Sequence, residues 1–536
     1  MDVLEVLSDA AVPRASSRRL HDALTFAFAR GESEERLLEL AAPALPPSTF
    51  QQESFAKDLF LDELILGCFP IELRGRRYEP SRAYLRGVLV HPPNRASVEL
   101  RQRVLSELTS SAERTLRLES AYLSLLDLRR ALSGGDAIGG RATHLRRRLD
   151  ILVQLKKAVE DVERLGEGAE SALGRAAQFA SSLAAGEPYQ RLLRLLHFED
   201  SRTVLESRLA LGYDGTLRRF EITGVSQAEH SSFPRGRLGR WLRSFIGLLK
   251  GYRFSEDDVM SQVLDQLFGD LEPAVIELLG CSVQIEFYLA CLGFRRSMQA
   301  KGYQVCLPTF ADEGASERAL EALFNPWLVM QGVSAVPFDD HLADGRSTLI
   351  LTGPNSGGKT RYLQALAVSQ LLGQAGSYVP ARAARLVWVE QMFLSLLESA
   401  NATQEEGRLG MELLRIRHVF ETSGPKSLIV MDELCSGTNP SEGEQIFDMV
   451  LGLFAELRPQ VLISTHFLDF AARLAAEDRP HLYFRQVELG PHDVPTYRFV
   501  PGVARTSLAR NTATRLGVTR DELLALVEAH KRSGSG

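Results

Sequence analysis

The sequence lacks the features that mark secreted, membrane-embedded and disulfide-stapled proteins. Its 536 residues include five cysteines and no CxxC pair, which favours a reducing compartment and disfavours a zinc site. No stretch of about 18 residues is free of charge, so we expect no membrane span. The first five residues are acidic and lack the apolar run of a signal peptide. We therefore expect a cytoplasmic protein.

The sequence also lacks an excess of positive charge. Lysine and arginine number 62 against 68 aspartates and glutamates, so any contact with nucleic acid must come from a local patch. Residues 217–253 hold eight basic and two acidic residues with aromatic residues between them, a composition suited to phosphates and to stacking. The same pattern also fits a solvated helix face whose aromatic residues belong to the core. The candidate DNA contacts are Arg218, Arg219, Arg235, Arg237, Arg240 and Arg243.

Apolar residues at helical spacing fill the first part of the chain. In residues 98–108 they recur three and four positions apart, which predicts an amphipathic helix. Similar runs cover 115–132, 143–164 and 188–212. We expect a helical lead over residues 1–50 and an all-α domain over 51–325. A small insert near 213–255 would interrupt that domain, with a short strand pair at 217–225.

After about residue 330 this helical pattern gives way to short runs of β-branched residues bounded by glycine and proline. Buried strands are predicted at 348–351, 428–431 and 461–464, with helical stretches between them. Strands that alternate with helices in this way indicate an α/β domain built on a largely parallel sheet. We expect that domain to cover residues 326–536 and to end in a helical tail.

A complete GxxxxGK[ST] phosphate-binding loop follows the first of these predicted strands and opens a predicted helix. Its glycines allow backbone N–H groups to turn toward phosphate oxygens. Lys359 can reach the β- and γ-phosphates, and Thr360 can ligate Mg²⁺. The predicted nucleotide-binding residues are Gly353, Pro354, Asn355, Ser356, Gly357, Gly358, Lys359 and Thr360.

Two further strands end in residues that fit the same chemistry. Asp432 and Glu433 follow one strand, and His466 follows the next. Because parallel strands place their carboxyl ends at one edge of a sheet, these residues are expected beside the phosphate loop. Asp432 would hold Mg²⁺, Glu433 would polarise the attacking water, and His466 would contact the γ-phosphate. The sequence thus predicts an ATPase that uses ATP and Mg²⁺.

The residues around this loop resemble the MutS family of DNA mismatch repair ATPases. Thr352 to Thr360 matches the family's TGPN-x-GGK[ST] loop, in which Asn355 is the distinguishing residue. Further motifs agree in order and spacing, namely residues 376–381, Asp432-Glu433-Leu434 with Ser436-Gly437-Thr438, Ser464-Thr465-His466, and 501–518. Weaker similarity to the family's helical lever domain covers 58–64, 91–93, 98–105 and Asn325-Pro326-Trp327-Leu328.

This resemblance implies a helical lever domain followed by an ABC-type ATPase domain. It also implies a homodimer, since family sites are completed across an interface, and double-stranded or branched DNA as the partner. Phe338 is the candidate for stacking on adenine.

The sequence departs from the family in three ways. Only about 50 residues precede the lever motifs, too few for the mismatch-reading and connector domains. Few residues follow the ATPase motifs, so we expect no small nuclease-type domain. The family's trans-acting signature corresponds to 405–411, where its serine is not found and Arg408 is a conjectural substitute. The rate of hydrolysis therefore does not follow from the resemblance.

We expect a MutS-like, DNA-binding ATPase of repair or recombination that does not read mismatches directly. The alternative is an ATP-driven mechanical module acting on a non-DNA target such as a ribosome or a partner protein. A chromosome-type coiled-coil ATPase is disfavoured, because such chains place the phosphate loop near the N-terminus, ahead of very long heptad arms.

Overall fold

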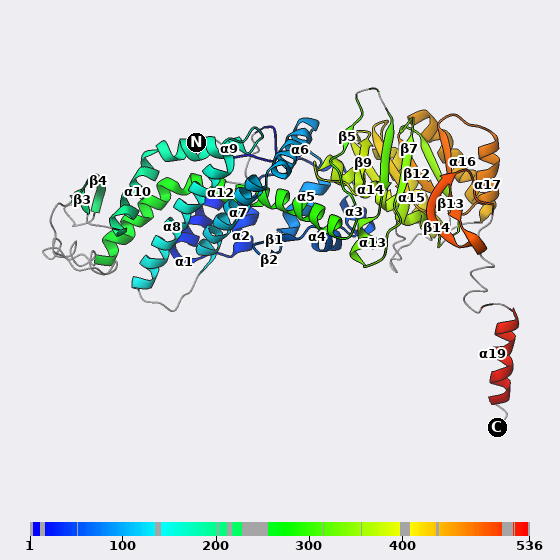
Figure 1. Ribbon diagram of the computed structural model, residues 1–536, viewed down its shortest axis with the longest axis horizontal. Helices are drawn as coiled ribbons and strands as arrows, with labels where there is room; N and C mark the ends of the chain where they lie inside the picture. Colours follow the sequence, from blue (N-terminus) through cyan, green and yellow to red (C-terminus); the bar gives the residue numbers. More distant parts are fainter. Residues whose placement is uncertain are drawn as a thin grey trace. The chain divides into compact units, whose positions relative to one another are not determined.

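The computed structural model describes most of the chain (Figure 1). The described residues are 4–10, 17–50, 52–134, 141–200, 203–211, 217–227, 256–312, 314, 316–354, 356–396, 408–435, 439–505, 518 and 520–533.

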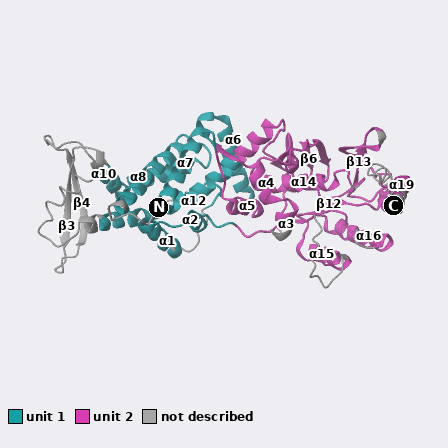
Figure 2. Cartoon of the chain, turned by 90° about the horizontal axis from the view of Figure 1, so that it is seen from below, with its two compact units in different colours: residues 1–45, 73–76, 94–290 teal, residues 46–72, 77–93, 291–536 magenta. Residues whose placement is uncertain are grey.

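The chain divides into two compact units (Figure 2). The first comprises residues 1–45, 73–76 and 94–290, and the second comprises 46–72, 77–93 and 291–536. Each unit is therefore built from several separate segments. The predicted domain boundaries after residues 50 and 325 stay predictions. The compact units divide the chain at other positions.

Helices make up most of the first unit. They are α1 (Ser17–Arg30), α2 (Glu34–Ala41), α6 (Arg95–Ser110), α7 (Ala112–Ser133), α8 (Arg141–Gly166), α9 (Gly174–Ala185), α10 (Glu187–Asp200) and most of α12 (Glu256–Ala300). The predicted helical runs at 98–108, 115–132 and 143–164 lie in α6, α7 and α8, which confirms them. In α6 the periodic residues Val98, Val104 and Leu108 are buried, as an amphipathic helix requires.

A β-hairpin corrects two predictions in this unit. The helical prediction for 188–212 is confirmed as far as Asp200, where α10 ends, and is wrong after it, because β3 (Thr203–Leu211) follows. The prediction of strand structure at 217–225 is confirmed, but the predicted pair within that range is wrong, because these residues form part of one strand, β4 (Leu217–Gln227), which pairs antiparallel with β3. Leucines at 205, 209 and 211 fit a period of two as well as a helical period, so local spacing could not decide. The expected all-α region thus contains strands.

The helix α12 contributes to both units. Among the described residues, its segment Ser261–Ala300 is the one helix long and apolar enough to cross a membrane, since it holds an 18-residue window with a mean hydropathy of 1.6. However, 89% of its apolar window is buried inside the structure, as in the core helix of a folded unit.

The short strand pair β1 (Ile71–Leu73) and β2 (Arg76–Tyr78) is divided between the two units, because residues 73–76 belong to the first. The second unit combines helices with two larger sheets. Its helices are α3 (Gln52–Asp58), α4 (Leu61–Cys68), α5 (Arg82–Val90), α13 (Pro326–Met330), α14 (Lys359–Gln374), α15 (Arg408–Thr422), α16 (Pro440–Leu457), α17 (Leu468–Ala476) and α19 (Arg520–Ser533), with the 3₁₀ turn η1 (Pro491–Asp493). Its remaining strands are β5 (Thr309–Phe310), β6 (Arg318–Leu323), β7 (Phe338–Leu342), β8 (Thr348–Thr352), β9 (Ala383–Leu386), β10 (Gln391–Ser395), β11 (Ser427–Met431), β12 (Gln460–Ser464), β13 (Leu482–Leu489) and β14 (Pro495–Pro501).

The main sheet has the strand order β10-β11-β12-β8-β13-β14. Its strands run parallel except β14, which pairs antiparallel with β13. The strands β8, β11 and β12 confirm the three predicted strands, and all five residues of each are buried. Such continuous burial is typical of parallel strands covered on both faces. A smaller sheet has the order β5-β9-β6-β7.

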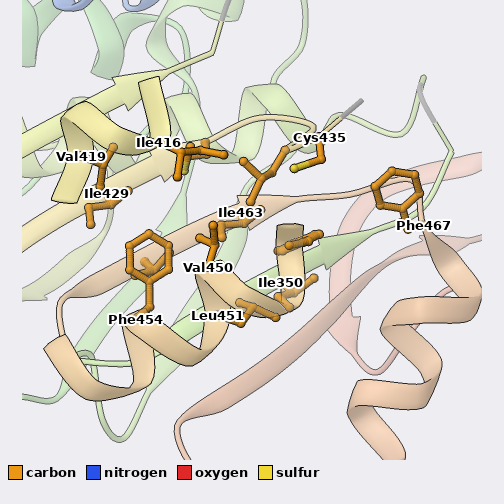
Figure 3. Close-up of a cluster of buried hydrophobic side chains, with 14 of the residues drawn as sticks. Ile350, Ile416, Val419, Ile429, Cys435, Val450, Leu451, Phe454, Ile463 and Phe467 are labelled. Carbon is orange, nitrogen blue, oxygen red and sulfur yellow. The ribbon is translucent and has the colours of Figure 1, made fainter. Parts of the chain in front are cut away.

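One face of the main sheet packs against α15 and α16 (Figure 3). Ile350, Ile429 and Ile463 come from the three central strands and lie among side chains of the two helices. The helical contributions are Ile416, Val419, Val450, Leu451 and Phe454. This core fixes the ends of β8, β11 and β12, and the loops that follow those ends carry the predicted site.

Candidate functional site

The phosphate-binding loop connects β8 to α14, and its glycines are required by conformation and space. Gly353 has a φ of 136° and Gly358 a φ of 89°, values that favour glycine. A Cβ atom at Gly353 would lie 2.6 Å from Cγ2 of Val487, and one at Gly357 would lie 2.7 Å from the same atom. The side chain of Val487 on β13 thus occupies the space that any larger residue would need. Asn355 lies outside the described residues.

Lys359 opens α14 and is almost fully buried, with 3% of its surface exposed. Its Nζ donates hydrogen bonds to the carbonyl oxygens of Gly353 at 2.9 Å and Pro354 at 3.2 Å. Burial lowers the pKa of this ammonium group, and the carboxylates of Glu433 and Asp432 offset only part of that shift. A phosphate group beside Nζ would supply the negative charge that favours the protonated form.

Thr360 and Asp432 meet at the carboxyl edge of the sheet. The Thr360 hydroxyl donates a hydrogen bond to Oδ2 of Asp432, and the hydroxyl of Ser464 donates one to Oδ1. These are oxygen donors of the kind that Mg²⁺ prefers. Within the described ranges no group of three or more His, Cys, Asp or Glu side chains could hold a metal ion. A pair of protein ligands such as Thr360 and Asp432 fits Mg²⁺, because this ion keeps several waters and binds phosphate oxygens.

Glu433 lies in a strained turn directly after Asp432. Its φ is 52°, in the left-handed region that non-glycine residues rarely adopt. Its backbone N–H donates a hydrogen bond of 2.9 Å to Oγ of Ser464. Two residues later Cys435 also has a positive φ, and its N–H donates to the carboxylate of Glu412 on α15. The turn that presents Glu433 is therefore held by side chains from β12 and α15.

His466 lies between β12 and α17, and its side chain is exposed. Its ring contacts the ring of the adjacent Phe467, with centroids 4.3 Å apart. Among the described contacts, no hydrogen bond joins the His466 ring to Lys359, Asp432 or Glu433. The structure thus brings Lys359, Thr360, Asp432 and Glu433 together and leaves His466 at the same edge of the sheet, open to solvent.

Several predicted residues lie partly or wholly outside the described residues. Arg218 and Arg219 are in β4, where only the backbone is described. Four candidate DNA contacts lie outside altogether, namely Arg235, Arg237, Arg240 and Arg243. The same holds for 436–438, 405–407 and 506–517, whereas Arg408 begins α15.

Phe338, the candidate for stacking on adenine, is buried in β7. Its ring stacks on Tyr362 with centroids 4.5 Å apart and meets Phe499 edge-on at 5.9 Å. With only 9% of the residue exposed, little of this ring is left for a base.

A buried polar cluster ties the first turn of α14 to both sheets. Asp340 on β7 is fully buried and accepts hydrogen bonds from Tyr362 and, at 2.8 Å, from Nε of Arg318. Arg485 on β13 lies 3.4 Å from Asp340 and donates to the carbonyls of Asp339 and His341. Burial opposes ionisation of Asp340, but the two guanidinium groups and the hydrogen bonds outweigh it and lower its pKa.

A second buried cluster connects α14 to residues near the start of the unit. Asn325 caps α13 by accepting a hydrogen bond from the Trp327 N–H at 2.9 Å, and it donates to Gln364 at 2.8 Å. Gln364 in turn donates to the carbonyl of Asp58 at 3.1 Å. The carboxylate of Asp58 accepts from the N–H of Leu396, directly after β10. Asn325 thus has a definite structural role at the start of α13.

The sequence motifs do not include Val487 or Tyr497, and they include Ser464 only within Ser464-Thr465-His466, with no role for its hydroxyl. Tyr497 on β14 has a φ of 60° and is 51% exposed, and its ring lies 3.4 Å from where a Cβ of Gly358 would be. It occupies an irregular stretch of the β13–β14 pairing, where the register shifts between Val487 and Leu489. The STH motif did include Ser464, but nothing in its spacing revealed the two hydrogen bonds made by its hydroxyl.

Comparison with known proteins agrees with this geometry. Residues 349–518 match the family model of MutS domain V, a range that runs from β8 past β14. An endonuclease MutS2 of Thermomicrobium roseum is 30% identical over 205 residues, 38% of this chain and 25% of that protein.

Two other relatives extend the same pattern. An endonuclease MutS2 of Ligilactobacillus salivarius is 26% identical over 285 residues, 52% of this chain and 34% of that protein. The DNA mismatch repair protein msh3 of Aspergillus oryzae is 31% identical over 188 residues, 34% of this chain and 17% of that protein. The matched segments thus span about a third or less of these relatives. The similarities support the MutS family and a MutS-like, DNA-related ATPase.

Proposed function

We propose that the protein binds and hydrolyses ATP with Mg²⁺ and acts on DNA in repair or recombination, without reading mismatches directly. The observation that carries this proposal is the shared hydrogen bonding of Thr360 and Ser464 to Asp432, beside Lys359 and Glu433. A phosphate loop, a metal-binding pair and a carboxylate for water activation then lie at one edge of a parallel sheet.

Each residue has a distinct task in this proposal. The loop's N–H groups and Lys359 bind the β- and γ-phosphates and compensate their charge. Thr360 and Asp432 would hold Mg²⁺, which neutralises charge on the phosphate oxygens when bound. Glu433 orients and polarises the attacking water, and His466, exposed at the same edge, contacts the γ-phosphate. The dry environment around Lys359 strengthens these interactions.

The wider architecture follows the family resemblance. We propose that the largely helical first unit is the lever and the second unit the ATPase. The chain would act as a cytoplasmic homodimer. Double-stranded or branched DNA would be its partner, with the basic residues of 217–253 as the contact.

Binding to DNA of several shapes across a salt series tests this function. Fluorescent homoduplex, single-mismatch, four-way branched and single-stranded DNA of equal length would be compared with ATP present. We expect branched DNA to bind tightest, mismatch and homoduplex to bind alike, and log K to fall linearly with log salt. Replacing Arg235, Arg237, Arg240 and Arg243 by alanine should flatten that slope, whereas Arg417→Ala on the exposed face of α15 should not.

The alternative is an ATP-driven mechanical module acting on a ribosome or partner protein. The net charge of −6 favours it, since the protein as a whole would repel nucleic acid. If the protein binds none of these DNA molecules and ribosomes stimulate its ATP hydrolysis, the alternative is established and the DNA-binding proposal fails.

A further inference from the structure

We propose that Ser464 is a positioning residue of the hydrolytic site, holding the metal-binding carboxylate and the backbone of the water-activating residue with one hydroxyl group. This inference rests on the proposed ATPase function and assigns a role within its site. The hydroxyl donates to Oδ1 of Asp432 and accepts from the N–H of Glu433 at 2.9 Å. Ser464 is fully buried, so water cannot replace either interaction readily.

The bond to Asp432 determines which carboxylate oxygen is presented to the metal. With Oδ1 occupied by Ser464, Oδ2 lies toward the Thr360 hydroxyl. Without Ser464 the carboxylate could rotate about its terminal torsion, which has a broad energy profile. Thr360 and Asp432 would then no longer be held in one arrangement before Mg²⁺ binds.

The bond to the N–H of Glu433 supports a strained backbone. A non-glycine residue with a φ of 52° persists only where its surroundings hold it there, and such residues cluster at functional sites. The Ser464 oxygen is the acceptor for this N–H. Removing it would leave a partly buried donor without its acceptor and would release the turn that aims Glu433.

The position of Ser464 in the sheet suits it to this task. It ends β12, which lies between β11 and β8 in the strand order. Ser464 is in register with Leu351 of β8, and the next residue, Thr465, donates its N–H to the Leu351 carbonyl at 3.0 Å. The backbone at Ser464 is therefore tied to the strand before the phosphate loop, and its side chain is tied to the acidic turn.

The test compares Ser464→Ala with the control Ser369→Ala. Ser369 is equally buried, and its hydroxyl donates a hydrogen bond within α14, to the carbonyl of Ala365. For Ser464→Ala we expect kcat to fall about tenfold and the Mg²⁺ concentration for half-maximal rate to rise several-fold, with KM for ATP changed less than about threefold. The control should change none of these. Ser464→Cys keeps a donor at this position, although the thiol is larger and a weaker donor than the hydroxyl. Its kcat should lie between those of Ser464→Ala and the unaltered protein, and it gives a second test if Ser464→Ala does not fold.

Two outcomes separate this inference from the proposed function. If the unaltered protein hydrolyses ATP and Glu433→Gln abolishes this hydrolysis, the ATPase function is established independently of Ser464. If Ser464→Ala then keeps the unaltered kcat and Mg²⁺ dependence, the positioning role is wrong while the ATPase stands. If the unaltered protein does not hydrolyse ATP, the ATPase fails. The Mg²⁺ dependence of binding a fluorescent ATP analogue then decides the role of Ser464, and an unshifted dependence in Ser464→Ala refutes it.

Discussion

The hydroxyl of Thr360, in the first turn of α14, donates a hydrogen bond to the carboxylate of Asp432, 72 residues further along the chain. Two segments that are separate in sequence thus place together a pair of oxygen atoms that would bind Mg²⁺ in the proposed function. Such preorganisation lowers the entropic cost of assembling the site.

Thr360→Val tests this pair by keeping the shape of the side chain and removing its hydroxyl. We expect the affinity for an ATP analogue to fall at least tenfold in the presence of Mg²⁺ and to change little in EDTA, because only the metal-dependent term is lost. Titration calorimetry under both conditions measures this. Equal loss in EDTA would mean that the hydroxyl serves the fold or the phosphates and not the metal.

Glu433→Gln separates binding from hydrolysis. The amide retains the size of the side chain but cannot accept a proton, so ATP affinity should stay within about threefold while turnover falls by roughly 10² or more. Steady-state phosphate release and equilibrium binding of the same preparation give the two values. Turnover equal to that of the unaltered protein would refute the assignment of Glu433.

Gly357→Ala tests the packing of the phosphate loop on β13. The new Cβ would lie 2.7 Å from Cγ2 of Val487, so the loop must shift, and we expect loss of ATP binding with about 1–3 kcal/mol of destabilisation. Shortening the obstacle in the double variant Gly357→Ala with Val487→Ala should restore part of the ATP affinity. As a control, Gly452→Ala in α16 meets nothing within 4 Å and should stabilise by up to about 1 kcal/mol.

Asp340→Asn tests the buried cluster at the first turn of α14. The substitution removes the negative charge beside Arg318 and Arg485. We therefore expect the free energy of unfolding, measured with urea, to fall by about 3–5 kcal/mol. The exposed pair of Arg382 and Glu321 is the control, and Glu321→Gln should cost less than about 1 kcal/mol.

The same cluster predicts a dependence of stability on pH. Because the folded-state pKa of Asp340 is lowered, its contribution is full above the unfolded value of about 3.9 and is lost as pH falls through the folded value. The difference in unfolding free energy between the unaltered protein and Asp340→Asn should be constant near neutral pH and shrink only in strong acid. A difference that shrinks already between pH 7 and 5 would contradict the lowered pKa.

The strands β8, β11 and β12 could be predicted from the sequence because the patterns that indicate them are local. The run before Gly353 and the runs before Asp432 and His466 are apolar, short and bounded by turn residues, and the structure confirms them as strands. The proximity of Thr360 and Asp432 follows from the edge rule for parallel strands. Their roles, like the roles of Glu433 and His466, stay predictions.

The remaining features depend on contacts that local pattern does not encode. The two hydrogen bonds of Ser464 and the obstruction by Val487 arise only once β11, β12, β8 and β13 lie side by side. The strand at 203–211 was predicted to be helical because its leucines fit both periods and its pairing with 217–227 decides between them. Nor does any local signal place Asp58 beside α14.

The contact between Asp58 and Gln364 spans 306 positions of the chain, and that between Asp58 and Leu396 spans 338. During synthesis, residues 46–72 therefore leave the ribosome long before the helix and strand they pack against. The second unit cannot complete its fold until the first unit has been made, and contacts of such long range form slowly. A fragment that begins at residue 326 would lack these early segments. A fragment designed so that the second unit folds alone should contain residues 46–93 joined to 291–536.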